Sequence, residues 1–318
     1  MRILKFGGKS LATKEKMQNV CKYIKKIYKN DQKIIVVVSA IGKTTDELIK
    51  KANHYSITKT PARELDVLLS TGETVSSALF ASMLCSMNVP AKSFQCFQIN
   101  LETFGAHQNS RIAYLNKKPL LEAMENGEVA VVAGFQGINK IGEITTLGRG
   151  GSDTTAVAIA SVFGQNVEIY SDFDGVFCGD PRLFNFKKFK KLNYDAMISM
   201  AKSGAKVLDL RATKIAKNFD CNIISKSSAE PTKKGTIISS IESDFLSISA
   251  IDDLSRISID FSDKNKIDFI LKIVTKEIKQ LNFYNLTVQD ENINFYVEKK
   301  NKGIVLSILS KKLNLLKK

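Results

Sequence analysis

The stretch Ile3-Leu4-Lys5-Phe6-Gly7-Gly8-Lys9-Ser10 begins as an apolar run and ends in two glycines and two polar residues. Such a run predicts a buried strand, and the glycine pair predicts a tight turn into the helix that residues 14–28 indicate. At such a turn in an α/β sheet, backbone N–H groups can receive phosphate oxygens, and Lys5 adds a positive charge. The stretch is not a P-loop, because GxxxxGK[ST] requires glycine at position 3, where the chain has isoleucine. On its own, the pattern also fits an ordinary strand-turn-helix corner.

Strand-like and helix-like segments alternate from residue 3 to about residue 238. Short β-branched runs predict strands, and a period near 3.6 predicts helices. The predicted strands cover residues 34–38, 129–132, 167–170 and 221–224, and the predicted helices cover residues 14–28, 63–70, 74–87, 153–162 and 194–203. This alternation is typical of an α/β fold whose mostly parallel sheet is covered by helices on both faces.

The pattern changes after Ser239. A strand-like segment, a helical one, a pair of strands and a second helical segment follow one another, at residues 245–261, 266–281, 283–298 and 303–315. This β-α-β-β-α order predicts a small α+β domain that lacks the last strand of a ferredoxin-like fold. We therefore expect two domains, residues 1–243 and 244–318, in agreement with a length of 318 residues.

The composition excludes several classes of protein. The five cysteines are odd in number and have no CxxC spacing, which argues against a disulfide framework or a zinc site and favours the cytoplasm. The longest apolar run, residues 34–38, is far shorter than the ~20 residues that span a bilayer. Lys5 lies where a signal peptide would be apolar, so we expect no membrane association.

The net charge of +15 raises the question of a nucleic-acid partner. The lysines are scattered through every predicted helix, and no aromatic-interleaved stripe or RNA-binding signature accompanies them. We therefore expect no nucleic-acid partner. An anionic small-molecule substrate would benefit from the same positive field.

A second glycine-rich segment, Thr145–Thr155, precedes the apolar helical run 156–162. Its three glycines let the backbone approach an anion closely, and Arg149 can grip a carboxylate with two parallel hydrogen bonds. Asp153 has two interpretations, since it can cap the helix or bind a substrate ammonium group.

A third segment, Tyr170–Phe177, ends a predicted strand in a polar loop that continues to Asp180-Pro181-Arg182. Open parallel sheets bind ligands at such strand ends, although a simple turn with local Asp hydrogen bonds explains the pattern as well. Three such loops that together carry Lys, Arg and Asp argue for an enzyme that handles phosphate.

The two histidines, His54 and His107, lie in no Ser/His/Asp pattern and at no metal-ligand spacing. Phosphoryl transfer to a carboxylate is compatible with this lack of a catalytic histidine, because a carboxylate with a pKa near 4 needs no general base at pH 7. It needs charge neutralisation and alignment, which lysines, backbone amides and Mg²⁺ supply.

In order and spacing, these motifs resemble those of aspartokinases. The matching segments are Lys5–Gly8, Val38–Asp46, Leu68–Glu73, Thr146–Thr155 and Asp172–Arg182. The resemblance covers about residues 3–238 and implies the amino acid kinase fold, a three-layer α/β/α sandwich, for residues 1–243. It implies transfer of the ATP γ-phosphoryl group to the side-chain carboxylate of L-aspartate, the first step of lysine, threonine and methionine synthesis.

The resemblance also implies roles for the matching residues. The implied ATP contacts are Lys5, Gly7, Gly8, Ser171, Asp172, Phe177, Arg182 and Lys206. The implied contacts to aspartate are Ser39, Thr45, Glu73, Arg149, Ser152 and Asp153. Of these residues, Lys5, Asp153 and Lys206 are the implied catalytic ones, and Arg149 would grip the α-carboxylate while Glu73 and Asp153 meet the ammonium group. ATP and Mg²⁺ are the implied cofactors.

The chain departs from the aspartokinase pattern at several positions. Lys9 stands where Thr or Ser is usual, Phe177 stands where a nucleotide-contacting Tyr is common, and Asp209-Leu210-Arg211 replaces His-Pro-Arg. Aspartokinases usually carry two ACT domains, whereas residues 244–318 suffice for a single, incomplete ACT-like domain. The unpaired sheet edge favours a homodimer or higher homo-oligomer. We expect this protein to respond weakly or not at all to lysine and threonine.

Two alternatives stay open. Another enzyme of the same fold, acting on glutamate or N-acetylglutamate, would share most of these motifs. A non-catalytic descendant is suggested by the +15 charge and by Lys9, although it would be expected to have lost the site charges that this chain retains.

Overall fold

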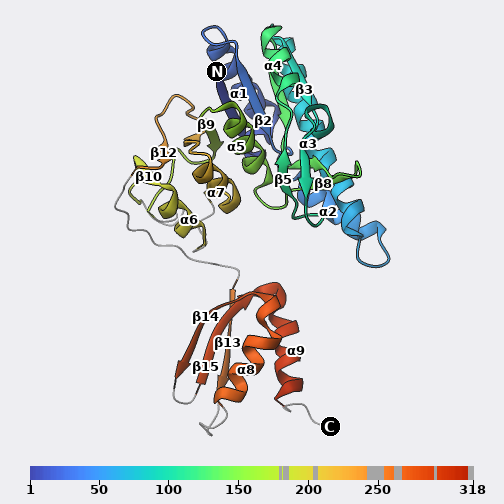
Figure 1. The fold of residues 1–318 in the computed structure, drawn as a ribbon, viewed down its shortest axis with the longest axis vertical. Coiled ribbons are helices and arrows are strands. Elements are labelled where there is room, and N and C mark those ends of the chain that lie inside the picture. The colour runs from blue at the N-terminus through green and yellow to red at the C-terminus, as the bar shows by residue number, and fades with distance from the viewer. Residues whose placement is uncertain are drawn as a thin grey trace. The chain divides into compact units, whose positions relative to one another are not determined.

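The computed structural model of the protein describes residues 1–178, 181, 186–202, 207–241, 254–260, 267–289 and 292–313. The chain forms two compact units, Met1–Ser249 and Ala250–Lys318, drawn in Figure 1. The predicted boundary between residues 243 and 244 lies outside the described residues and stays a prediction.

The first unit is built on a sheet whose described strands follow the order β10-β12-β11-β9-β1-β2-β6-β3. These strands are β1 (Arg2–Phe6), β2 (Ile34–Val38), β3 (Ala91–Phe94), β6 (Val129–Ala133), β9 (Val167–Ser171), β10 (Lys191–Asn193), β11 (Ile223–Ser227) and β12 (Thr236–Ser239). Within this sheet, each strand from β3 to β11 is parallel to its neighbour. The pair of β11 and β12 is the antiparallel one among the pairs described for this sheet. The predicted α/β fold with a mostly parallel sheet is confirmed.

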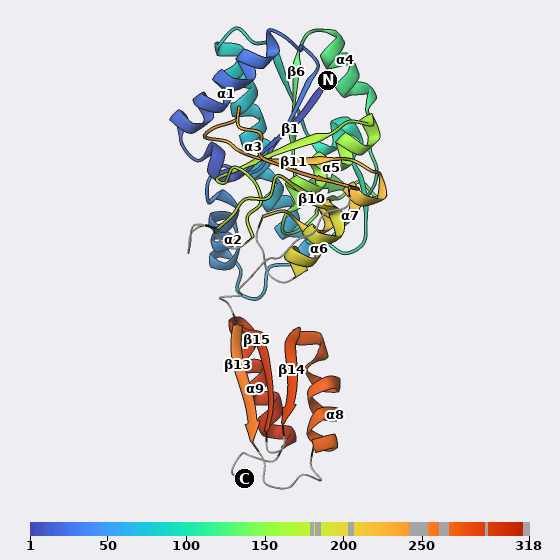
Figure 2. The same cartoon turned by 90° about the vertical axis from the view of Figure 1, so that its left-hand side faces the viewer.

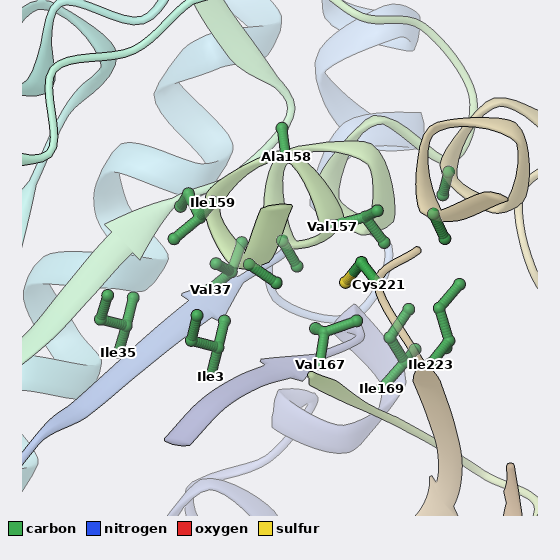
Figure 3. Close-up of a cluster of buried hydrophobic side chains, with 14 of the residues drawn as sticks. Ile3, Ile35, Val37, Val157, Ala158, Ile159, Val167, Ile169, Cys221 and Ile223 are labelled. Atoms are coloured by element: carbon green, nitrogen blue, oxygen red, sulfur yellow. The ribbon is translucent and has the colours of Figure 1, made fainter. Parts of the chain in front are cut away.

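Successive side chains of the central strands enter two different hydrophobic cores, as the period of two in a strand requires. Ile3, Ile35 and Val37 belong to one core, together with apolar residues of helices α4 (Lys118–Glu125), α5 (Gly151–Phe163), α6 (Tyr194–Lys202) and α7 (Leu210–Asn218). Figure 3 shows this core, with Val157 and Ile159 of α5 beside the strand residues.

The opposite face of the sheet packs against α1 (Lys14–Tyr28) and α3 (Ala62–Ser86), where Leu4 and Phe6 are buried. Figure 2 shows α1 and α3 on one side of β1 and β11, with α5 and α7 on the other. The first unit is therefore a three-layer α/β/α sandwich.

Helix α1 has the predicted bounds, but the two helices predicted at 63–70 and 74–87 form one continuous helix, α3. The prediction of a break was wrong because one helical glycine costs only about 1 kcal/mol, which burial of the helix offsets. Gly72 also lets α3 approach the chain after β2, since a Cβ there would lie 2.9 Å from that of Ala40. By length and composition α3 could span a membrane, yet half of its most apolar stretch is buried inside the fold, as in a core helix.

A small four-stranded sheet, which the sequence analysis did not predict, lies beside the large one. Its order is β5-β4-β7-β8, with β4 (Glu102–Phe104), β5 (Arg111–Tyr114), β7 (Gln136–Ile138) and β8 (Ile144–Thr146). Strand β8 leads directly into the glycine-rich segment before α5, so this sheet positions that segment. Short additional helices are η1 (Gly8–Leu11), α2 (Thr44–Tyr55) and η2 (Cys96–Ile99).

The second unit contains β13 (Leu254–Asp260), α8 (Ile267–Glu277), η4 (Lys279–Leu281), β14 (Phe283–Gln289), β15 (Asn292–Glu298), η5 (Lys299–Asn301) and α9 (Lys302–Lys312). Its strands form an antiparallel sheet of order β13-β15-β14. Ile257, Val274, Phe295 and Val305 form its core, and both helices lie on one side of the sheet in Figure 1. The observed β-α-β-β-α order agrees with the predicted one.

Candidate functional site

Lys5 and Asp153 form a buried ion pair, with Nζ of Lys5 2.5 Å from Oδ1 of Asp153. Both residues are only 9% exposed. Lys5 shares a face of β1 with Ile3 and therefore points toward α5, whose first turn carries Asp153. Of the two interpretations of Asp153, capping is wrong, because the N-cap of α5 is Gly150 and no side chain caps the helix.

The glycine pair after β1 lies against the loops that follow the neighbouring strands. The N–H of Gly7 donates to the carbonyl oxygen of Tyr170 at 3.4 Å, and the N–H of Gly42 donates to that of Gly8 at 3.0 Å. A Cβ at Gly8 would lie 2.3 Å from the carbonyl oxygen of Ala40, so only glycine fits there. The loops after β1, β2 and β9 therefore meet at the carboxyl edge of the parallel sheet. Of the three loops predicted to handle phosphate, those after β1 and β9 lie at this edge, whereas residues 145–155 follow β8 of the small sheet.

Glu73 reaches this edge from α3. It is 4% exposed, and its Oε1 accepts a hydrogen bond of 2.9 Å from the N–H of Ala40. Burial raises the pKa of Glu73 to about 7, although the bond from Ala40 and the charge of Lys5 oppose this shift. Among the described residues Oε2 has no hydrogen-bond partner. A buried carboxylate oxygen without a partner is suited to a cationic or hydrogen-donating ligand.

Arg149 occupies the turn between β8 and α5. The turn is formed by two glycines in the left-handed region, Gly148 with φ +73° and Gly150 with φ +72°. The Arg149 side chain is exposed, and within the described part of the chain its guanidinium forms no hydrogen bond or ion pair. It is therefore available for a carboxylate.

The predicted nucleotide side begins where β9 ends. The carbonyl oxygen of Ser171 accepts from the N–H of Ser228 at 2.9 Å, and its hydroxyl accepts from the N–H of Phe173 at 3.2 Å. The carboxylate of Asp172 lies 3.2 Å from Nζ of Lys9, and both side chains are exposed. The extra charge of Lys9 is thus balanced by a residue of the predicted ATP contacts.

The remaining predicted site residues are distributed as follows. Ser39 follows β2, and its N–H donates to the carbonyl oxygen of Phe6 at 3.2 Å. Thr45 lies in the first turn of α2, and Ser152 lies in the first turn of α5 against Gly134. Phe177 forms an isolated antiparallel bridge with Lys188. Arg182 and Lys206 lie outside the described residues, and their roles stay predictions.

Asp66 is a fully buried carboxylate that was not among the predicted site residues, and it contacts the glycine-rich segment through Thr146. It accepts hydrogen bonds from the hydroxyl of Thr146 at 2.5 Å and from the N–H of Gln108 at 3.1 Å, and lies 2.7 Å from Nδ1 of His107. A signal existed, because Asp66 and Glu73 are two helical turns apart and share one face of α3.

The site therefore combines a buried lysine, glycine loops with close backbone approach and several carboxylates, among them Glu73 with its raised pKa. Such a set can bind an anionic ligand and a substrate with both a carboxylate and an ammonium group. The described residues contain no group of three or more His, Cys, Asp and Glu side chains that could hold a metal ion by itself.

Comparisons with known proteins agree with this geometry. The chain is 46% identical to the aspartokinase of Thermus thermophilus over 219 residues, which are 68% of this chain and 54% of that protein. It is similar to the crystal structure of aspartate kinase from Synechocystis, with a TM-score of 0.65, 31% identity, and coverage of 97% of this chain and 54% of that one. E. coli aspartokinase III in complex with aspartate and ADP has a TM-score of 0.69 at 19% identity, covering 98% and 100% of the two chains, which shows a shared fold.

The chain spans about half the length of the curated relatives it matches. Residues 1–225, which contain every predicted site residue, match the model of the amino acid kinase family. The chain belongs to the amino acid kinase family.

Proposed function

We propose that this protein is an aspartate kinase, which transfers the γ-phosphoryl group of ATP to the side-chain carboxylate of L-aspartate and so starts the synthesis of lysine, threonine and methionine. The observation that carries the proposal is the position of Lys5. Its Nζ pairs with Asp153 and would lie 3.6 Å from a Cβ at Gly7, so one buried cation touches both the predicted phosphate loop and the predicted substrate side. The 46% identity to an aspartokinase supports aspartate as the acceptor.

Aspartate presents three charged groups to the site. The exposed guanidinium of Arg149, which has no side-chain partner among the described residues, suits the α-carboxylate, which it can bind through two parallel hydrogen bonds. Oε2 of Glu73, which accepts no hydrogen bond from the part of the chain that the structure describes, suits the ammonium group, which would lower the pKa of Glu73 and favour its ionised form. The side-chain carboxylate is then left to face the nucleotide.

The transfer itself requires little proton chemistry. A carboxylate oxygen of aspartate, ionised at pH 7, forms the new bond to the γ-phosphorus while the bond to the β,γ-bridging oxygen breaks and ADP leaves. Lys5 neutralises negative charge on the phosphoryl group in the transition state, and Asp153 fixes the position of the lysine ammonium group.

Mg²⁺ accompanies ATP in this proposal. The ion takes most of its ligands from phosphate oxygens and water and needs only one or two protein carboxylates. Asp172, an exposed carboxylate at the carboxyl end of β9, has the hard oxygen donors that fit this role. Mg²⁺ would neutralise phosphate charge there.

The test is a hydroxylamine-trapping assay with purified protein, ATP, Mg²⁺ and L-aspartate, run beside L-glutamate and N-acetylglutamate. We expect hydroxamate from aspartate alone. The Lys5→Ala variant, purified identically, controls for a contaminating host kinase, and its signal should fall at least ~100-fold. Hydroxamate from glutamate or N-acetylglutamate instead, or from none of the three, would refute the proposal.

The proposal includes a homo-oligomer in the cytoplasm. Within the described part of the second unit, β13 is an edge strand, and an unpaired edge favours pairing with another subunit. All five cysteines are free, as is usual in a reducing compartment. Light scattering on the eluted protein would give the number of subunits.

A further inference from the structure

Arg211, in the first turn of α7, binds the backbone of the Arg149 turn. Its Nη2 donates to the carbonyl oxygen of Arg149 at 2.5 Å, and its Nη1 donates to Oδ1 of Asn109 at 3.1 Å. One guanidinium thus joins three segments that are distant in sequence: α7, the loop before β5 and the turn between β8 and α5.

Asp209 forms an ion pair with this guanidinium. It is the N-cap of α7, where its Oδ1 accepts from the N–H groups of Arg211 and Ala212 at 2.9 and 3.2 Å, and it lies 3.6 Å from Nε of Arg211. Asp209 also packs directly on the turn, because a Cβ at Gly150 would lie 2.3 Å from its Oδ2. Both Arg149 and its glycine neighbour are therefore in contact with the Asp209-Leu210-Arg211 segment.

The turn needs such support. Arg149 stands between two left-handed glycines, which carry the largest backbone entropy of any residue. A mobile turn would have to be ordered each time a ligand bound, at a cost in affinity. The bond from Arg211 removes this freedom in advance.

We propose that Arg211 is a positioning residue for substrate binding: by fixing the carbonyl of Arg149, it presents the Arg149 guanidinium to the α-carboxylate of the amino-acid substrate. The inference deepens the proposed function and rests on it for the identity of the substrate. Arginine suits this role better than lysine, because its planar fork makes two hydrogen bonds in fixed directions.

The experiment compares Arg211→Ala and Arg211→Lys with a matched control, Lys217→Ala. Lys217 is a cation of the same helix, and it pairs with Asp195 on the surface, away from the turn. We expect Arg211→Ala to raise the KM for aspartate about tenfold while kcat and the KM for ATP stay unchanged, the signature of lost uniform binding. Arg211→Lys should lie in between, and Lys217→Ala should match the wild type.

A double-variant cycle separates positioning from general structural support. If Arg211 acts through Arg149, then Arg211→Ala should change the KM for aspartate little once Arg149 is already Ala. Additive effects in the two backgrounds would overturn the proposal, as would equal losses for aspartate and ATP.

Hydrogen exchange of the peptide covering residues 146–152 provides a readout that does not depend on the substrate. Arg211→Ala should speed exchange there, and Lys217→Ala should not. If the wild type fails to phosphorylate aspartate yet shows this pattern, the proposed function fails while the anchoring role of Arg211 stands. Unchanged exchange in Arg211→Ala overturns that role, whatever the substrate.

Discussion

Nζ of Lys5 lies 2.5 Å from Oδ1 of Asp153, although the two residues come from the first strand and from a helix far along the chain. Both residues are only 9% exposed, so each charge has the other as its main compensation. Asp153 therefore has a structural role that does not depend on any ligand. Substitution of either residue is therefore expected to change stability as well as activity, and the two have to be measured separately.

Lys5→Ala should lower kcat at least ~100-fold, the scale of losing one preorganised charge partner of the transition state. It should also lower the free energy of unfolding by about 3 kcal/mol, because it leaves Asp153 buried without a partner. The double variant Lys5→Met with Asp153→Asn should recover stability but not activity. Denaturant titration and steady-state kinetics measure the two quantities, and recovery of both together would contradict the catalytic role of Lys5.

Arg149→Ala should raise the KM for aspartate with little change in kcat, because its grip on the α-carboxylate is the same in the ground and transition states. Stability should stay within about 0.5 kcal/mol of the wild type, since the exposed guanidinium has no partner among the described residues. Initial rates at varied aspartate and at varied ATP test this prediction. A rise in the KM for ATP of the same size would place Arg149 on the nucleotide instead.

Glu73→Gln should change how stability depends on pH. Burial raises the pKa of Glu73 from 4.5 to about 7, so folding favours its protonated form. This contribution to stability is fully present below pH 4.5 and is lost as the pH rises through about 7. Glutamine cannot ionise and avoids the loss.

Relative to Glu73→Gln, the wild type should therefore become less stable between pH 5 and pH 8, by up to about 3 kcal/mol. The comparison cancels the titration of other groups, which the two proteins share. Urea unfolding of both proteins at several pH values gives the difference, and a difference independent of pH would mean that Glu73 is ionised in the fold throughout.

Gly8→Ala should destabilise the protein by at least about 1 kcal/mol and abolish activity, because its Cβ would lie 2.3 Å from the backbone oxygen of Ala40. Gly7→Ala is the matched control, since a Cβ there meets its nearest neighbour at an ordinary 3.6 Å. Thermal unfolding of the two variants compares them directly. Equal effects at the two positions would argue against the close approach of the loops after β1 and β2.

The sequence predicted the layers of the first unit well, because strand and helix periodicities reflect burial that is local to each segment. The bounds of α1 and the buried run of β2 follow directly from such patterns. The same reasoning failed at α3, where the two helices predicted at 63–70 and 74–87 are one helix that continues through Gly72. The packing that tolerates a helical glycine there involves Ala40, a residue far away in the sequence.

The candidate site, like the fold, could be predicted only in part from the sequence. The residue types and the order of the glycine motifs were sufficient to single out Lys5, Arg149 and Asp153, since glycines and charges at strand ends have a local chemical meaning. Glu73 was selected only through the resemblance to aspartokinases. Only the tertiary structure decided that Asp153 pairs with Lys5, that Glu73 has a pKa near 7 and that Arg211 holds the Arg149 turn. Pairing, desolvation and long-range hydrogen bonds depend on which segments meet in space, and the periodicity of a single segment carries no information about its neighbours.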